Sequence, residues 1–225
     1  LAPEMARLRT AHAAGRLPHA LLIHEAPGAG GEWLAGWTAR MVLCSHPEEA
    51  PCGRCASCHR AAQGQHPDLT LVRPLEASTQ IRIEQLRELA AELALTAHQG
   101  GYKVGILSPA DSMNRFSANA LLKTLEEPPQ GTLLILVASQ PSRLPATILS
   151  RCQRVRVRAP QPAEAIAWLE ATRGPGDWDR VLAVLGPAPM TAAGADPAAV
   201  AEIEAEVRLG LEEAAAGGGD AVVME

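Results

Sequence analysis

The chain has 225 residues, of which 47% are hydrophobic and 20% are charged, an ordinary composition for a globular protein with one large domain and room for a small second one. No apolar run approaches the roughly 18 to 20 residues that a membrane-spanning helix needs, and the N-terminus has no charged stretch followed by an apolar block, so we expect a cytoplasmic protein without a membrane partner. The net charge of −5 argues against strong binding of nucleic acid by this chain alone, because that affinity comes from Lys and Arg neutralising phosphates.

The negative charge is concentrated at the C-terminal end. Residues 1–190 contain 19 Lys and Arg against 17 Asp and Glu, whereas residues 191–225 contain one Arg against eight acidic residues. Any contact with DNA is therefore expected in the first part of the chain and with help from partners. Lysine is rare, because only Lys103 and Lys123 occur.

Short apolar runs alternate with helical patterns along the first part of the chain. The first run, 20–24, lies between Pro18 and a glycine cluster at 28–31, which predicts a buried strand that enters a turn. Further strands are predicted at 69–72, 103–107, 132–138 and about 153–158, and helices at about 32–43, 82–97 and 116–127, the last including Phe116 among its apolar positions. This alternation predicts an α/β fold with a parallel sheet covered by helices on both faces.

A break at Pro160-Gln161-Pro162 predicts the boundary of the first domain. Residues 163–190 have the pattern of small helices, and a further helix is predicted at about 197–214.

Four cysteines form a Cys-x7-Cys-x2-Cys-x2-Cys array: Cys44, Cys52, Cys55 and Cys58. Thiolates at this spacing can turn onto one metal ion, and four of them make the closed tetrahedral shell of a structural zinc site. The alternatives are four free thiols or disulfides, which a reducing cytosol disfavours. The nearby His46, His59 and His66 are expected at the surface or in packing rather than as ligands, and Cys152 is expected in the core.

Residues 25–32, Glu-Ala-Pro-Gly-Ala-Gly-Gly-Glu, lie between the first strand and the next helix, the place of a phosphate loop of pattern G-x-x-x-x-G-K-S/T. Gly28 and Gly30 keep the loop rich in glycine, but Glu25 stands at the first glycine position, Gly31 at the lysine and Glu32 at the Ser/Thr. The lysine normally reaches the β- and γ-phosphates and the hydroxyl binds Mg²⁺, so this degenerate loop predicts that ATP is not a cofactor. An ordinary glycine-rich turn is the alternative.

The strand at 103–107 ends without the acidic residues of an active ATPase. Such an enzyme places one acidic residue there for Mg²⁺ and one that polarises water. Here Ser108-Pro109-Ala110-Asp111 follows, in which only Asp111 is acidic and lies late. Both halves of a nucleotide site are therefore degraded.

The string at 119–129, Asn-Ala-Leu-Leu-Lys-Thr-Leu-Glu-Glu-Pro-Pro, resembles a signature of the bacterial DNA polymerase III clamp-loader family, whose members are AAA+ proteins. Further matches occur in the same order, at 16–22, in the cysteine array, at His66-Pro67-Asp68 and at 148–152, and together they are very specific. Within that family the gamma/tau branch keeps a working phosphate loop, whereas the delta-prime branch is similar to this chain in lacking the lysine and the acidic pair.

The resemblance implies an AAA+ core at 1–160 with a zinc module at 44–58, a helical lid domain at 161–190 and the start of a helical collar domain at 191–225. It implies a non-hydrolysing subunit, without catalytic activity of its own, in a hetero-pentamer with gamma/tau and delta subunits that loads the sliding clamp onto primed DNA during replication. It also implies that Arg151 of the Ser-Arg-Cys motif acts in trans, as an arginine finger on ATP held by the adjacent subunit. An ordinary surface arginine is the alternative.

Two other functions compete with this interpretation. An ATP-hydrolysing subunit of the gamma/tau kind would need a lysine at position 31. A separate zinc module that binds DNA is disfavoured by the acidic balance and the few aromatic residues. The alternating arginines at 154, 156 and 158 predict an edge strand with a solvated arginine face, and a DNA-facing role is the alternative.

Overall fold

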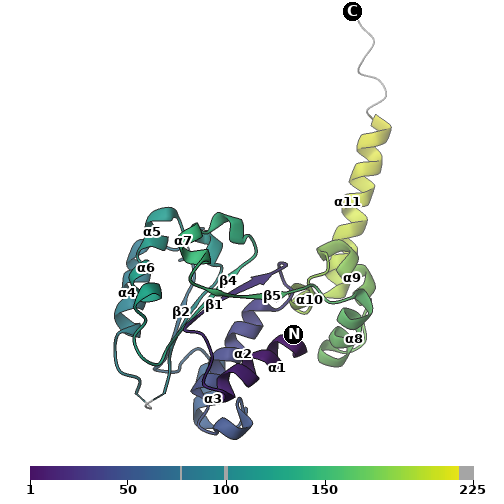
Figure 1. Ribbon diagram of the computed structural model, residues 1–225. Coiled ribbons are helices and arrows are strands. Elements are labelled where there is room, and N and C mark those ends of the chain that lie inside the picture. Colours follow the sequence, from purple (N-terminus) through teal and green to yellow (C-terminus); the bar gives the residue numbers. More distant parts are fainter. Residues whose placement is uncertain (77, 99–100, 218–225) are drawn as a thin grey trace, which may run out of the picture. The chain divides into compact units, whose positions relative to one another are not determined.

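The computed structural model describes residues 1–76, 78–98 and 101–217, and its packing divides the chain into two compact units, Leu1–Arg158 and Ala159–Glu225 (Figure 1). Within the described ranges, every helix is too short or too polar to cross a bilayer.

The first unit is built on five parallel strands in the order β2-β3-β4-β1-β5. Their bounds are Ala20–Glu25 for β1, Leu69–Val72 for β2, Lys103–Leu107 for β3, Thr132–Ala138 for β4 and Gln153–Val157 for β5. The predicted bounds of β2, β3 and β4 match those in the structure. The predicted α/β fold with a parallel sheet is confirmed, because each strand is reached by a connection that crosses a face of the sheet.

Helices cover both faces of the sheet (Figure 1). Successive strand side chains point to opposite faces, so Leu21 and Ile23 of β1 pack in one core while Leu22 packs in another. The first core includes α1 (Ala2–Ala13), α2 (Gly31–Leu43) and α3 (Ala56–Ala62), and the second includes α4 (Ile83–Leu93), α5 (Arg115–Asn119), α6 (Leu122–Glu126) and α7 (Ala146–Leu149). Three short 3-10 turns lie between these elements: η1 (Pro47–Glu49), η2 (Ala110–Ser112) and η3 (Pro141–Arg143).

The helix predicted at 116–127 is two short helices, α5 and α6. The backbone tightens between them, since the N–H groups of Ala120 and Leu121 donate to the carbonyls of Ser117 and Ala118, three residues earlier. Phe116, which the sequence pattern assigns to the apolar face, is 78% exposed. The prediction was therefore wrong about the continuity of this helix and about its first apolar residue.

Two other helices also differ from expectation. The helix predicted to reach residue 97 ends at Leu93, because the N–H of Leu95 bonds back only three residues to Glu92 and the side chain of Leu95 faces solvent. Sequence reasoning missed α1, whose one buried side chain is Leu8. Such a helix has no apolar stripe, and the signals that favour its start, Pro3 and Glu4 in the first turn, are weak by themselves.

The second unit is helical in its described residues, with α8 (Pro162–Arg173), α9 (Trp178–Leu185), α10 (Pro189–Ala192) and α11 (Pro197–Gly217). Leu169, Trp178 and Val181 form its small core. Arg180 of α9 forms an ion pair with Glu204 of α11. The division of this part into a lid and the start of a collar stays a prediction, and residues 218–225 lie outside the described residues.

Candidate metal centre and degenerate nucleotide loop

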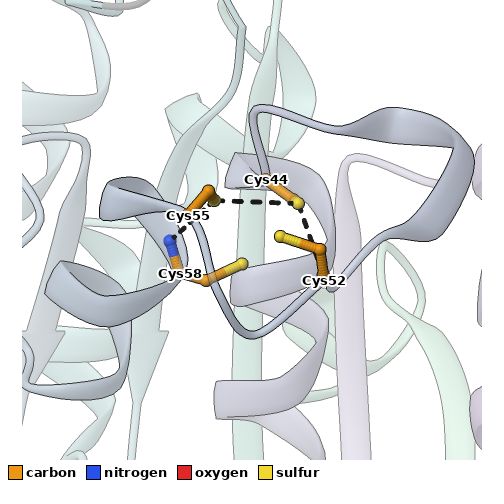
Figure 2. A group of neighbouring side chains, drawn as sticks. All are labelled: Cys44, Cys52, Cys55 and Cys58. Atoms are coloured by element: carbon orange, nitrogen blue, oxygen red, sulfur yellow. Dashed lines mark hydrogen bonds between the residues drawn. The ribbon is translucent and has the colours of Figure 1, made fainter.

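The four cysteines of the array lie together where α2 is followed by α3 (Figure 2). Cys44 comes directly after α2, Cys52 lies in the loop, Cys55 is the N-cap of α3 and Cys58 lies in its first turn. Their sulfur atoms all lie within 4.8 Å of one another. The structure thus confirms that the array forms one cluster, which could hold a metal ion such as zinc.

The spacing and the hydrogen bonds of this cluster fit a four-coordinate metal ion. Four sulfurs bound to one zinc at about 2.3 Å are about 3.8 Å apart at the corners of a tetrahedron, and the sulfurs of Cys44 and Cys55 are 4.0 Å apart. The N–H of Cys52 donates to the sulfur of Cys44 at 3.4 Å, and the N–H of Cys58 donates to that of Cys55 at 3.3 Å. Such donors stabilise thiolates, the form that binds a metal.

The thiols of the cluster differ in how readily they ionise. Burial alone would raise the pKa of the Cys55 thiol, but the N–H groups of Cys58 and Ser45 and the neighbouring thiols lower it to about 5. Burial raises the pKa of Cys58 to about 12. A positive ion among the four sulfurs would favour the thiolate form of both.

His46 and His59, which were predicted to be surface or packing residues, are both exposed. The ring of His46 lies at the rim of the cluster, with Nδ1 3.8 Å from the sulfur of Cys52. The four thiols alone account for the coordination shell of a tetrahedral ion, so neither histidine is needed as a ligand.

A buried chain of hydrogen bonds ties the cysteine module to the sheet. Ser57 of α3 donates to the carbonyl of Leu43, and its hydroxyl lies 2.8 Å from Nε2 of His66. Nδ1 of His66 accepts the N–H of Asp68 at 3.1 Å, so Nε2 has the proton and donates it to Ser57. Burial lowers the pKa of His66, which favours the neutral ring. Both ring nitrogens are engaged, so His66, which was predicted to be a surface or packing residue, is a buried one.

Asp68 and Lys103 continue this chain as a buried ion pair. Nζ of Lys103 is 3.4 Å from Oδ1 of Asp68, and their side chains are 6% and 1% exposed. The same oxygen accepts the N–H of His98 at 2.9 Å. Burial alone would raise the pKa of Asp68, but the N–H of His98 and the ammonium of Lys103 outweigh it and hold this pKa below its usual range. Sequence reasoning missed the pair, because its members lie far apart in the chain.

Replacing Asp68 by asparagine is expected to lower the free energy of unfolding by about 3–5 kcal/mol, the usual cost of removing one partner of a buried ion pair. The ammonium of Lys103 would then face a neutral amide. Urea unfolding at neutral pH measures the change, with Glu92→Gln as the control. Glu92 lies 3.9 Å from the same ammonium but is 52% exposed, so its loss should cost about 0–1 kcal/mol. Equal costs for the two variants would contradict the prediction.

The stabilisation by Asp68 also depends on pH in a defined direction. Its folded-state pKa is lowered from the ordinary value of 3.8. A group with a lowered pKa contributes fully above its unfolded value, and the contribution is lost as pH falls through the folded value. The difference between wild type and Asp68→Asn should therefore be constant at neutral pH and shrink only below about 3.8.

The glycine loop joins β1 to α2, the position of a phosphate loop in a strand-loop-helix unit. Gly28 and Gly30 have φ angles of 72° and 102°, and these left-handed conformations turn the chain into α2. Glu25, the last residue of β1, accepts the N–H of Gly31 with Oε2 at 2.5 Å. The lysine position is thus occupied by a buried glycine in contact with a carboxylate of the same chain.

Other carboxylates of the degraded site also bind groups within the protein. Glu32 of α2 accepts the hydroxyl of Ser108, just after β3, at 3.2 Å and forms an exposed ion pair with Arg73. Asp111 is buried, and its Oδ2 accepts the N–H of Gln140 at 2.7 Å. Both carboxylates are therefore already bound to other groups of the same chain.

Arg151 follows α7 and is 34% exposed. Its guanidinium donates to Oε1 of Glu126 at 2.7 Å and to the carbonyl of Thr147 at 3.0 Å. Glu126 belongs to the string at 119–129, so this ion pair joins two of the motifs found in the sequence. Sequence reasoning did not anticipate the contact.

Arg151 and the glycine loop lie at opposite ends of the parallel strands. Gln153, two residues after Arg151, pairs with Leu21 near the start of β1, whereas Val157 pairs with Glu25 at its end. At about 3.3 Å per residue, the length of β5 separates these two pairs by about 13 Å. The guanidinium therefore does not belong to the site formed by its own loop.

Comparison with known proteins gives concordant matches. Residues 2–161 match the family model described as "DNA polymerase III, delta subunit". The DNA polymerase III subunit delta' of Pseudomonas aeruginosa is 40% identical over 199 residues, covering 86% of this chain and 60% of its own. That of Bacillus subtilis is 40% identical over 147 residues, or 65% and 44% of the two chains. The tau/gamma subunit of Haemophilus influenzae is 37% identical over 145 residues, or 64% and 21%.

A solved structure with a similar fold is the gamma subunit-related DNA polymerase III protein of Thermotoga maritima. It superposes with a TM-score of 0.61 at 20% identity, over 83% of this chain and 57% of the other. At this identity the match concerns the fold alone. The chain spans 60% or less of the length of the curated relatives it matches.

Proposed function

Because the chain belongs to the delta-prime subunit family of DNA polymerase III, we propose that it helps to load the sliding clamp onto primed DNA without hydrolysing ATP itself. Its proposed partners are gamma/tau and delta subunits in a hetero-pentamer, with the clamp and DNA reached through that complex. The main support is the degraded nucleotide site, in which Gly31 and Glu32 replace the lysine and the metal-binding hydroxyl while the family's other motifs are retained.

Arg151 is the residue proposed to act on ATP held by the adjacent subunit. A guanidinium is always charged and can contact two phosphate oxygens at once, which neutralises charge on a transferring phosphoryl group. The separation of Arg151 from its own glycine loop supports a role toward another molecule. Glu126, its present partner, is half exposed, so the pair is weak enough to be exchanged for a phosphate contact.

The four-cysteine cluster is proposed to hold a structural zinc ion. When bound, the ion would supply four metal-sulfur bonds that fix the path from α2 to α3, and four thiolates leave no open position for a substrate. The role of the module's residues would then be structural and not catalytic. Hydrogen bonds through Ser57 and His66 connect the cluster to Asp68, the residue before β2.

In the second unit, residues 161–190, which include α8 and α9, are proposed to form the lid, and residues 191–225, which include α11, the start of the collar. The support comes from α11, on which Ile203, Val207 and Leu211 are all more than half exposed. Their spacing of four residues places them on one face. An exposed apolar stripe of this kind fits a helix that packs against further helices.

The protein is expected to show neither ATP hydrolysis nor ATP binding at micromolar concentrations, because the loop lacks the cation and the metal ligand that hold a triphosphate. Titration calorimetry with Mg·ATP tests this, with a gamma/tau subunit that has an intact loop as the positive control. Gly31→Lys combined with Glu32→Thr should remain inactive as an ATPase, since the segment at 108–111 still lacks the acidic pair. Micromolar affinity of the wild type would contradict the proposal and favour the ATP-hydrolysing alternative.

A further inference from the structure

The carboxylate of Glu25 lies where the glycine loop presents its backbone donors. Oε2 accepts the N–H of Gly31 at 2.5 Å, and the backbone of Gly30, the residue before it, also favours the charged form of the carboxylate. Gly30 is the N-cap of α2 and Gly31 its first residue, at the start of a 13-residue helix. N–H groups at such an end have no partner within the helix, and together with the helix dipole they favour an anion.

The position of Glu25 in the loop pattern explains how its side chain reaches these donors. Position 25 corresponds to the first glycine of G-x-x-x-x-G-K-S/T, where the lack of a side chain leaves the interior of the loop free for phosphate. Here the side chain instead folds back from the end of β1 to the start of α2. Burial raises the pKa of Glu25 above its usual range, and the backbone of Gly31 and Gly30 limits that rise. The carboxylate is thus partly removed from water and held by the loop's own donors.

Gly31 fits this arrangement because it has no side chain. A Cβ atom at position 31 would lie 2.7 Å from Cδ of Glu25 and 2.9 Å from its Cβ, far inside the roughly 3.5–4.0 Å of normal carbon contacts. By contrast, a Cβ atom at Gly36, in the same helix, would have no atom within 4 Å. The glutamate at 25 and any side chain at 31, including the lysine of an active loop, therefore compete for one space.

We propose that Glu25 is an internal anion that takes the place of a phosphate group in the glycine loop and keeps the loop closed to phosphate ligands. The loop is then a filled anion site and not an empty one. The two unusual residues form a unit, since the carboxylate replaces the ligand and Gly31 makes room for it. This inference goes beyond the proposed role in clamp loading and does not depend on it.

The steric part is tested by a double-mutant cycle on thermal unfolding. Gly31→Ala should lower the midpoint in the wild-type background. In the Glu25→Gly background it should raise the midpoint, because alanine favours a helix over glycine once the clash is gone. The expected coupling is at least about 3 °C in the midpoint. The matched control is Gly36→Ala, which should have the same effect in both backgrounds.

The electrostatic part is tested with inorganic phosphate as the probe, against chloride at equal ionic strength. Phosphate should raise the midpoint of Glu25→Gly by about 2 °C or more, since it binds the donors that the carboxylate has left. The wild type should show no such rise. Glu84→Gln removes an exposed carboxylate from the first turn of α4 and should behave like the wild type.

Each test has an outcome that overturns the proposal. Absence of coupling between positions 25 and 31, or equal coupling between 25 and 36, would remove the steric argument. Equal responses of wild type and Glu25→Gly to phosphate, including no response in either, would show that the carboxylate does not hold the place of a phosphate. ATP binding by the wild type bears on the proposed function, whereas these comparisons concern only the occupant of the loop.

Discussion

Removal of the metal from the cysteine cluster is expected to lower the midpoint of thermal unfolding by about 8–16 °C. An ion that binds only the folded chain stabilises it by about 4 kcal/mol when its free concentration is 1,000 times its dissociation constant. For a protein of this size 1 kcal/mol corresponds to about 2–4 °C. The measurement is a thermal unfolding curve with and without a chelator, on protein whose metal content has been determined.

Two cysteine variants show whether the cluster is the source of this effect. Cys55→Ser removes one of the four ligands, so the protein should lose most of its zinc and most of its response to the chelator. Cys152→Ser changes a buried thiol outside the cluster and should keep both. Less than half an equivalent of zinc in wild type purified without chelator would contradict the prediction, as would an undiminished chelator response of Cys55→Ser.

Arg151→Ala is expected to slow ATP turnover at the one interface that this subunit faces and to impair clamp loading. Arginine fingers in GTPases contribute about 10³ to 10⁵ in rate, or about 4–7 kcal/mol of barrier. A complex with several ATP sites should lose less in total. Arg151→Lys should restore little, because an ammonium lacks the planar two-pronged contact with phosphate oxygens. The assay is ATP hydrolysis and clamp loading by the complete complex with clamp and primed DNA.

The ion pair with Glu126 allows the finger to be separated from a structural role. If Arg151 only holds the local fold, then Glu126→Gln, which breaks the same pair, should have the same effect. If Arg151 contacts ATP, its loss should be far more damaging than that of Glu126. Arg143→Ala, at another exposed arginine, controls for loss of charge. Wild-type loading by Arg151→Ala would return this residue to the surface-arginine interpretation.

The strands and the cysteine cluster could be predicted because their signals are local. The run at 132–138 is apolar after Thr132 and is buried throughout in β4, as expected of a strand covered on both faces. The cysteines are close in sequence, so one loop and one helical turn bring them together. The degraded loop was also visible, since the pattern G-x-x-x-x-G-K-S/T fixes which position should have been lysine.

The contacts that the sequence did not reveal are those between distant segments. Asp68 meets Lys103 because β2 and β3 are neighbours in the sheet, and Arg151 meets Glu126 because α6 and α7 pack together. Glu25 could be recognised from the sequence only as the residue at the first glycine position of the loop pattern, because its contact with Gly31 depends on the turn of the loop. The break between α5 and α6 was missed because the turn between them is also right-handed, so the apolar residues keep nearly the same helical spacing across it.

The parallel sheet has a further consequence for an assembly of such subunits. All strands point the same way, so the glycine loop lies at their carboxyl ends and Arg151 at their amino ends. The two ends of the sheet are therefore chemically different. Subunits arranged head to tail would each contact the nucleotide of one neighbour and expose their own nucleotide to the other. A subunit whose loop is closed would hold no nucleotide of its own, so in the proposed ring the row of nucleotide sites would end at this subunit.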